Sequence, residues 1–254
     1  MSADPLLSLR GVSKSYWRGS RELKVIQEAS LDLHGGELVA VWGQRRSGKT
    51  TLLKLAAGLE EADAGSVHVV GRNLAQLSPK QFAGVLRETI GWAKPTGPEN
   101  RDLSMLDYLA MPLLRRYSSR EAQRVAAQAL AQVGVAECAA QRWSSLADSE
   151  QALVAIAHAL VREPRVLLVD DQTANLDDLQ REEVMTLLRA VAEQRGVGVL
   201  VTVPDMAEMV HAHRLRSLSS GRLLAPPDAS EGEGDVIYLP RVEDRHHGAG
   251  GASA

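Results

Sequence analysis

Residues 43–51 read Gly43-Gln44-Arg45-Arg46-Ser47-Gly48-Lys49-Thr50-Thr51. An apolar run at 38–42 precedes them, as expected of a strand that is buried on both faces of a parallel sheet. A helix-forming run at 51–57 follows them and stops at Gly58, a residue type that commonly ends helices. The nine residues fit the pattern G-x-x-x-x-G-K-[ST], whose backbone N–H groups and helix N-terminus point toward phosphates. A glycine-rich turn that only happens to contain Lys and Thr is the alternative, but the flanking strand and helix favour a nucleoside triphosphate site.

The side chains of this loop have different expected roles. Lys49 would reach the β- and γ-phosphates, and the Thr50 hydroxyl would ligate Mg²⁺. Arg45 and Arg46 would either add contacts to phosphate oxygens or point into solvent, and the sequence favours neither role. The whole loop, 43–51, is therefore predicted to bind the nucleotide.

A second motif, which is acidic, would complete such a nucleotide-binding site. Four apolar residues at 166–169 are followed directly by Asp170 and Asp171. Asp170 would hold Mg²⁺, directly or through water, and Asp171 could orient an attacking water. A strand end with two solvated acids is the alternative. After a phosphate-binding loop, the sequence favours the magnesium role.

The bulk composition excludes several classes of protein. The 254 residues carry a net charge of −3, so no strong field favours nucleic acid as a partner. The one cysteine, Cys138, rules out a disulfide framework and fits a reducing compartment. No apolar run approaches the roughly 18 residues that a membrane span needs, and no signal-peptide pattern opens the chain. We expect a cytoplasmic protein that reaches a membrane through a partner.

The order of the predicted elements indicates an α/β fold. Short strands are expected at 6–9, 24–26, 30–33 and 66–70, which would form an N-terminal antiparallel β region. The signal is then mainly helical until about residue 160, after which strands return at 166–169 and 197–201, each behind a helix. This alternation predicts a P-loop NTPase core with a mostly parallel sheet and right-handed crossovers.

Two helices and two boundaries follow from the same pattern. Apolar residues recur at helical spacing over 102–115 and 118–133, and Ser118 ahead of Glu121 is a capping-box signature. We expect one nucleotide-binding domain over 1–225, with a helical insertion at about 95–160. The remainder, 226–254, is rich in Gly, Pro and acidic residues and is predicted to be disordered.

Further motifs follow in a fixed order along the chain. Tyr16, or its neighbour Trp17, precedes the loop. Between the loop and Asp170 stands the motif Leu146-Ala147-Asp148-Ser149-Glu150-Gln151, which leads into an apolar helix at 154–160. Beyond Asp170 comes Thr173-Ala174-Asn175-Leu176-Asp177. Over about residues 5–224 the chain resembles the nucleotide-binding subunits of ATP-binding cassette (ABC) transporters. Its motif Asn175-Leu176-Asp177 is most similar to that of the macrolide-export and lipoprotein-release branch.

The resemblance implies ligands and partners. It implies that ATP and Mg²⁺ are bound, with Tyr16 stacked on the adenine. It implies a second ABC subunit, in a homodimer or a heterodimer, whose interface includes the signature residues 146–150 and Asp177. It also implies a membrane-spanning permease, contacted through residues such as 102–108, and a peripheral position on the cytoplasmic face of the membrane.

The signature motif departs from the family pattern, which is Leu-Ser-Gly-Gly followed by Glu or Gln. Ala147 replaces the serine that contacts the γ-phosphate bound by the opposed subunit. Asp148 and Ser149 replace glycines whose lack of a side chain allows close backbone approach. The negative charge of Asp148 would also repel a triphosphate.

The catalytic positions depart as well. Asp171 stands in place of a glutamate and is shorter by one methylene, roughly 1.5 Å. Lys94-Pro95 stands where the family has a glutamine that touches Mg²⁺ and water. Val203 replaces a histidine that reaches the γ-phosphate, and His211 or His213, about two helical turns further on, would be a poor substitute.

The binding half of the site is therefore expected to work and the hydrolytic half to be weakened. The leading interpretation is the ATP-binding subunit of a membrane ABC complex with reduced hydrolysis. A fully active ABC ATPase, in which Asp171 suffices, is the second interpretation. A pseudo-ATPase that binds ATP and regulates a partner is the third.

Overall fold

The computed structural model describes residues 4–94 and 96–225. Pro95 and the tail at 226–254, which the sequence predicts to be disordered, lie outside the described residues. None of the helices in the described ranges is long and apolar enough to cross a membrane.

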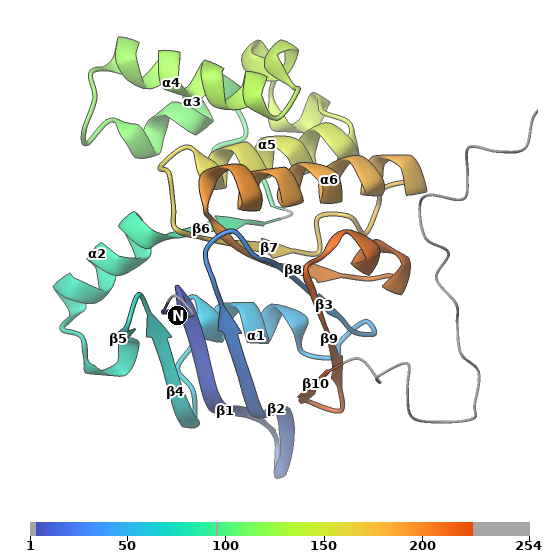
Figure 1. Cartoon of the computed structure of the whole chain (residues 1–254). Coiled ribbons are helices and arrows are strands. Elements are labelled where there is room, and N and C mark those ends of the chain that lie inside the picture. Colours follow the sequence, from blue (N-terminus) through green and yellow to red (C-terminus); the bar gives the residue numbers. More distant parts are fainter. Residues whose placement is uncertain (1–3, 95, 226–254) are drawn as a thin grey trace, which may run out of the picture.

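Two sheets and a group of helices make up the structure (Figure 1). The strands are β1 (Leu7–Arg18), β2 (Arg21–Leu33), β3 (Leu38–Trp42), β4 (Ala64–Val69), β5 (Arg72–Asn73), β6 (Ile90–Ala93), β7 (Val166–Asp170), β8 (Gly198–Val203), β9 (Arg214–Ser219) and β10 (Arg222–Leu224). The α-helices are α1 (Lys49–Ala56), α2 (Pro79–Thr89), α3 (Met105–Ala110), α4 (Ser119–Gln132), α5 (Asp148–Leu160) and α6 (Asp178–Arg195). Short 3₁₀ turns are η1 (Leu74–Gln76), η2 (Met111–Leu113), η3 (Ala136–Ala140), η4 (Trp143–Ser145) and η5 (Met206–His211).

The two sheets have the predicted character. The first has the order β2-β1-β4-β5 and is antiparallel throughout. The second has the order β10-β9-β3-β8-β7-β6; only the β10–β9 pair is antiparallel. The predicted α/β fold, with a mostly parallel sheet and an antiparallel N-terminal region, is confirmed.

Alternate residues of the central strands face two different cores. Val39 and Val41 of β3 pack with α1 and the antiparallel sheet, whereas Leu38 and Ala40 pack with the helices of the opposite face. Figure 1 shows the same division, with α1 below the parallel sheet and α5 and α6 above it. Because both faces are covered, the strands are continuously apolar, as the sequence around the loop predicted.

Two predicted elements differ from the observed ones. The expected strands at 24–26 and 30–33 are parts of one strand, β2, because a β-bulge keeps it paired with β1. Glu28 takes a positive φ of 50° there, and its N–H donates to Ser13 Oγ at 3.0 Å. The predicted helix over 102–115 is shorter, since α3 ends at Ala110 and a 3₁₀ turn containing Pro112 follows it.

The capping prediction for the second helix is correct. Ser118 caps α4, its side chain accepts from Glu121 N at 3.4 Å, and the Glu121 carboxylate accepts from Ser118 N at 3.0 Å. Both hydrogen bonds satisfy backbone donors that the first turn of a helix leaves unpaired.

Parallel pairing brings the predicted motifs to one edge of the sheet. Trp42, the last residue of β3, is paired with Val203, and Asp170 is paired with Thr202. The loop after β3 and the carboxylates at the end of β7 therefore lie at the same edge of the sheet, with only β8 between the two strands. Ligands commonly bind at the carboxyl ends of the strands in α/β sheets.

Candidate functional site

Space and backbone geometry require both glycines of the loop. A Cβ on Gly43 would lie 2.5 Å from Ser47 Oγ and 2.9 Å from the carbonyl oxygen of Leu218. Gly48 has a φ of 105°, and a Cβ there would lie 3.0 Å from Val25. Gly48 is also the residue before α1, so the loop delivers the chain directly into a helix N-terminus.

The side chain of Lys49 crosses the loop. Its Nζ donates to Gly43 O at 2.6 Å and to Gln44 O at 3.4 Å, and the residue is only 8% exposed. Ser47 Oγ is buried and, among the described residues, has no hydrogen-bond partner. A buried ammonium held by carbonyl groups and an unpaired hydroxyl can both turn to phosphate oxygens, since a charge-assisted hydrogen bond is the stronger one.

Two hydroxyl groups hold the buried carboxylate of Asp170. Thr50 Oγ1 donates to Asp170 Oδ1 at 3.1 Å, and Thr202 Oγ1 lies 3.3 Å from the same oxygen. Burial raises the pKa of Asp170, the two hydroxyl contacts oppose that rise, and the charge of Asp171 adds to it. A carboxylate and a hydroxyl at one point are ligands suited to Mg²⁺, whose charge would offset the cost of burying Asp170.

Asp171 has a constrained backbone. Its φ is 51°, and its N–H donates to Thr202 Oγ1 at 3.0 Å. Its Oδ1 is buried and, in the part of the chain that the structure describes, unpartnered. Gln172 Nε2 and Thr173 Oγ1 are likewise buried without a hydrogen-bond partner among the described residues. Three consecutive residues after β7 therefore each have a buried, unpaired polar atom. Buried polar atoms without partners cost free energy unless a ligand, water or another chain satisfies them.

Sequence reasoning missed Thr202, which contacts both acids. A sequence pattern could have pointed to Thr202, because this polar residue follows an apolar run at the end of a strand, as Asp170 does. Only the register of β7 with β8 shows that the two residues are neighbours.

The two candidates for the adenine contact differ in exposure. Tyr16 is 37% exposed and Trp17 is 72% exposed. The Tyr16 hydroxyl hydrogen-bonds to Glu60, and Lys14 Nζ lies 5.8 Å from the ring centroid. Burial and the Glu60 contact raise the pKa of Tyr16, and Thr51 at the start of α1 opposes the rise. Tyr16 therefore lies beside the phosphate-binding helix.

The signature residues lie at the start of α5. Leu146 is buried, and its carbonyl accepts from Gln151 Nε2 at 3.0 Å. Glu150 Oε2 accepts from Ala147 N at 2.7 Å, but Ala147 has no side-chain oxygen to return the contact. Asp148 is exposed and Ser149 half-buried. Among the described residues, no hydrogen bond or ion pair joins residues 146–150 to the phosphate-binding loop.

The remaining predicted positions have local contacts. Asp177 caps α6, and its Oδ1 accepts from Gln180 N at 2.9 Å. Lys94 Nζ lies 5.2 Å from the centroid of the Trp92 ring. Val203 is fully buried.

Two histidines and two arginines complete the set. His213 Nδ1 accepts from Leu38 N at 2.9 Å, and its Nε2 contacts Glu193 at 3.1 Å. Because Leu38 begins β3, the ring lies at the amino end of that strand, whereas the phosphate-binding loop follows the carboxyl end. The carbonyl of His211 accepts from an arginine of α6. Arg45 and Arg46 are exposed and line a hollow beside the loop, which leaves both expected roles open.

Comparisons with known proteins identify the family. A family model described as "ABC transporter" matches residues 26–174. The lipoprotein-releasing system ATP-binding protein LolD of Chromohalobacter salexigens is 34% identical over 219 residues, covering 86% of this chain and 92% of that protein. The dimeric structure of MJ0796, a bacterial ABC transporter cassette, has a TM-score of 0.79 at 26% identity and covers 85% of this chain and 96% of that one. The chain belongs to the ABC transporter family.

Other relatives are longer than this chain. The macrolide export ATP-binding/permease protein MacB of Escherichia coli is 32% identical over 221 residues, which are 87% of this chain but 34% of that protein. The chain thus spans about a third of that relative. LolD and MacB match the lipoprotein-release and macrolide-export branch that the sequence predicted.

The family's ligand fits the residues present. ABC cassettes bind ATP with Mg²⁺, and a solved relative of this fold is bound to ADP and phosphate. Ser47 Oγ, which has no hydrogen-bond partner in the described part of the chain, and the buried Lys49 are donors of the kind that phosphate groups need, and the Thr50–Asp170 pair offers oxygen atoms of the kind that Mg²⁺ needs.

Proposed function

We propose that this chain is the ATP-binding subunit of an ABC transporter and hydrolyses ATP slowly. The main support for the proposal is a difference within the site between the residues for Mg-ATP binding and the residues for hydrolysis. The contacts of Lys49 with the loop carbonyls and of Thr50 with Asp170 support Mg-ATP binding. Asp171 and Val203 differ from the glutamate and histidine that the family resemblance implies for hydrolysis. The names of the relatives, an ATP-binding protein of a releasing system and an ATP-binding/permease protein, support a membrane-spanning permease as partner.

Binding would use the residues that the loop brings together. The N–H groups of 43–51 and Lys49 would hold the phosphates, Thr50 and Asp170 would hold Mg²⁺, and Tyr16 would stack on the adenine. The chain's own contribution is then to bind and orient the triphosphate. We assign residues 1–225 to this domain and about 95–160 to its helical insertion, and place the chain on the cytoplasmic face of the membrane beside its permease.

Hydrolysis would be slow for two local reasons. The side chain of Asp171 is roughly 1.5 Å shorter than that of glutamate. Its backbone N–H donates to Thr202 Oγ1, which opposes a main-chain shift that would make up the distance. Val203 has no hydrogen-bond donor for the γ-phosphate. Loss of one such donor typically costs about 100-fold, or about 2.7 kcal/mol of transition-state stabilisation.

The dimer decides how these differences combine. ABC subunits pair head to tail, so each ATP lies between one chain's loop and the other chain's signature, here 146–150. A homodimer would carry every difference at both sites. A heterodimer with an unaltered subunit would have two half-impaired sites. In either case we propose that ATP acts mainly as a ligand for occupancy and dimerisation.

Co-purification and turnover test the proposal together. From detergent-solubilised membranes, the chain should bring down a membrane-spanning protein. The complex should hydrolyse ATP at or below about 0.1 s⁻¹, about 100-fold under the median enzyme rate of roughly 10 s⁻¹. A Lys49→Ala complex gives the background rate.

The outcomes separate the three interpretations. A rate near 10 s⁻¹ would identify a fully active ATPase and contradict slow hydrolysis. Capture of a soluble partner, with no membrane protein, would identify a regulatory ATP-binding protein and contradict the transporter role.

A further inference from the structure

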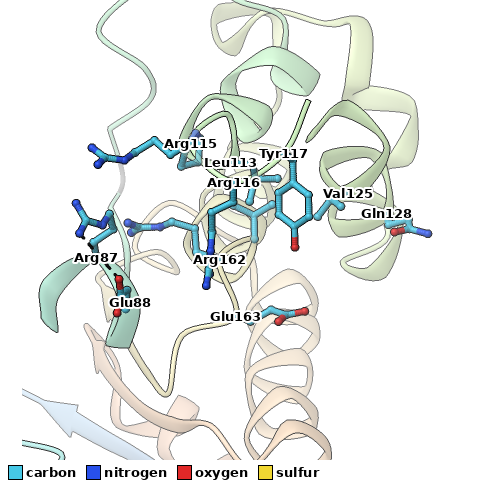
Figure 2. A pocket seen from close by; sticks show the side chains of 12 residues that line it. Arg87, Glu88, Leu113, Arg115, Arg116, Tyr117, Val125, Gln128, Arg162 and Glu163 are labelled. Carbon is cyan, nitrogen blue, oxygen red and sulfur yellow. Dashed lines mark ion pairs between the residues drawn. The ribbon is translucent and has the colours of Figure 1, made fainter. Parts of the chain in front are cut away.

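A second hollow, far from the phosphate-binding loop, is lined by arginines. It has a volume of about 320 Å³ and is lined by the end of α2, the turn after α3, one side of α4 and the residues after α5. Four arginines and two glutamates line it, which leaves a net charge of +2. The charged residues are Arg87, Arg115, Arg116, Arg162, Glu88 and Glu163. Figure 2 shows the arginines gathered around the hollow with Tyr117 beside them.

Of the four arginines, one forms an ion pair with a residue that the structure describes. Among the described residues, the one ion pair in the hollow joins Arg87 to Glu88 at 3.9 Å, and both side chains are largely exposed. Arg162 is half-buried and forms no ion pair with a carboxylate in the described ranges 4–94 and 96–225. Burial, followed by the charge of Arg87, lowers the pKa of Arg162. A half-buried guanidinium near a second one is costly alone, and an anion would relieve both the desolvation and the repulsion.

The turn that carries two of the arginines also exposes apolar side chains. Met111, Leu114 and Tyr117 recur every three residues and are 53%, 50% and 45% exposed. Arg115 and Arg116 lie between Leu114 and Tyr117 in the sequence. The backbone here is fixed, since Tyr117 N donates to Leu113 O at 3.1 Å and Leu114 N donates to Met111 O at 3.3 Å. The segment presents cations and apolar groups together on a rigid turn.

The arginines of the hollow and the exposed apolar side chains beside them together favour one kind of anionic ligand over others. A free phosphate or a carboxylate would satisfy the guanidinium groups, but neither would cover Met111, Leu114 and Tyr117. A bilayer containing anionic lipids provides phosphate groups for arginines and an apolar interface for the flanking side chains. We propose that the hollow binds the phosphate of an anionic phospholipid headgroup, so that this chain contacts the membrane surface itself, independently of any permease and of ATP.

Vesicle flotation of the full chain tests this proposal. Wild-type protein should float with vesicles of phosphatidylcholine and phosphatidylglycerol in a three-to-one ratio, and not with phosphatidylcholine alone. Each basic residue near such a surface contributes on the order of 1 kcal/mol, so Arg115→Gln/Arg116→Gln should weaken binding about thirtyfold. Leu114→Ser should weaken it without any change in charge, and added salt should weaken it further.

A matched variant controls for net charge. Arg18 and Arg21 are exposed arginines at the tip of the β1–β2 hairpin, so Arg18→Gln/Arg21→Gln removes the same charge elsewhere. Its binding should remain within about twofold of wild type, as expected for charges outside the contact. Nucleotide binding by both double variants should equal that of wild type, which keeps this test separate from the proposed ATP function.

Three results would overturn the proposal. One is equal flotation with neutral and anionic vesicles, and another is equal loss of binding in the two double variants. The third is arginine-dependent binding of soluble glycerol phosphate or poly-glutamate, measured by calorimetry, without vesicle binding. That result would assign the hollow to a free phosphate ligand or to an acidic peptide.

Discussion

Lengthening the side chain of Asp171 should accelerate ATP hydrolysis. The backbone of Asp171 is fixed by its φ of 51° and by the 3.0 Å contact of its N–H with Thr202 Oγ1. Asp171→Glu therefore moves the carboxylate outward by about one bond, roughly 1.5 Å, and not the main chain. A displacement of about 1 Å at a catalytic group can change a rate on the order of 100-fold. We expect turnover to rise about 10- to 100-fold, which corresponds to about 1.4–2.7 kcal/mol of transition-state stabilisation.

The same change should lower stability. Asp tolerates a positive φ better than most residues, so glutamate at this position should cost on the order of 1 kcal/mol. For a chain of this size, that corresponds to a fall of about 2–4 °C in Tm.

Single-turnover assays with radiolabelled ATP measure the rate, and thermal unfolding measures the stability. Asp171→Asn, which keeps the shorter length and removes the charge, is the control and should not hydrolyse faster than wild type. An Asp171→Glu variant that bound ATP normally and turned over no faster than wild type would show that the length of this side chain does not limit hydrolysis.

Three further changes test the binding half of the site and the fold. Burial raises the pKa of Asp170, so ionising this carboxyl costs the folded protein more than the unfolded chain. The folded protein is therefore more stable at low pH, where Asp170 is protonated, and loses that stability as the pH rises through the raised pKa. Asp170→Asn should therefore raise the Tm of the nucleotide-free protein at pH 8, show no such gain near pH 4, and abolish Mg-dependent ATP binding; an unchanged or lower Tm at pH 8 would contradict this. Tyr16→Ala should weaken ATP binding about tenfold through lost stacking, with Tyr16→Phe and Trp17→Ala close to wild type in equilibrium titrations; a larger loss in the Trp17 variant would move the adenine contact there. Ser118→Ala should lower the free energy of unfolding by about 1 kcal/mol in urea, with Ser118→Thr as control; equal losses in both variants would argue against the cap.

The local parts of the structure were predictable from the sequence. The run at 38–42 and the loop that follows it predicted β3 and the start of α1 correctly, because a doubly buried strand and a glycine-rich turn into a helix are encoded by neighbouring residues. The cap at Ser118 was predictable for the same reason.

The parts that depend on distant residues were not predictable. Thr202 contacts Asp170 only through the register of two strands that lie about 30 residues apart in the sequence. Arg87 and Arg162 meet because α2 and the end of α5 converge, and no spacing rule connects them. The continuity of β2 required the bulge at Glu28, where a single sequence shows only two short apolar runs.

The identity of the nucleotide that the protein retains distinguishes slow from normal ATP hydrolysis. The purified chain is incubated with Mg-ATP, desalted rapidly and denatured, and the released nucleotide is identified by chromatography, with Lys49→Ala as control. Wild type should retain ATP and the control should retain neither nucleotide. Lys49 would hold the triphosphate and Asp170 its Mg²⁺, whereas the short side chain of Asp171 would orient the attacking water poorly. Retained ADP in place of ATP would contradict slow hydrolysis and make this chain a working ATPase.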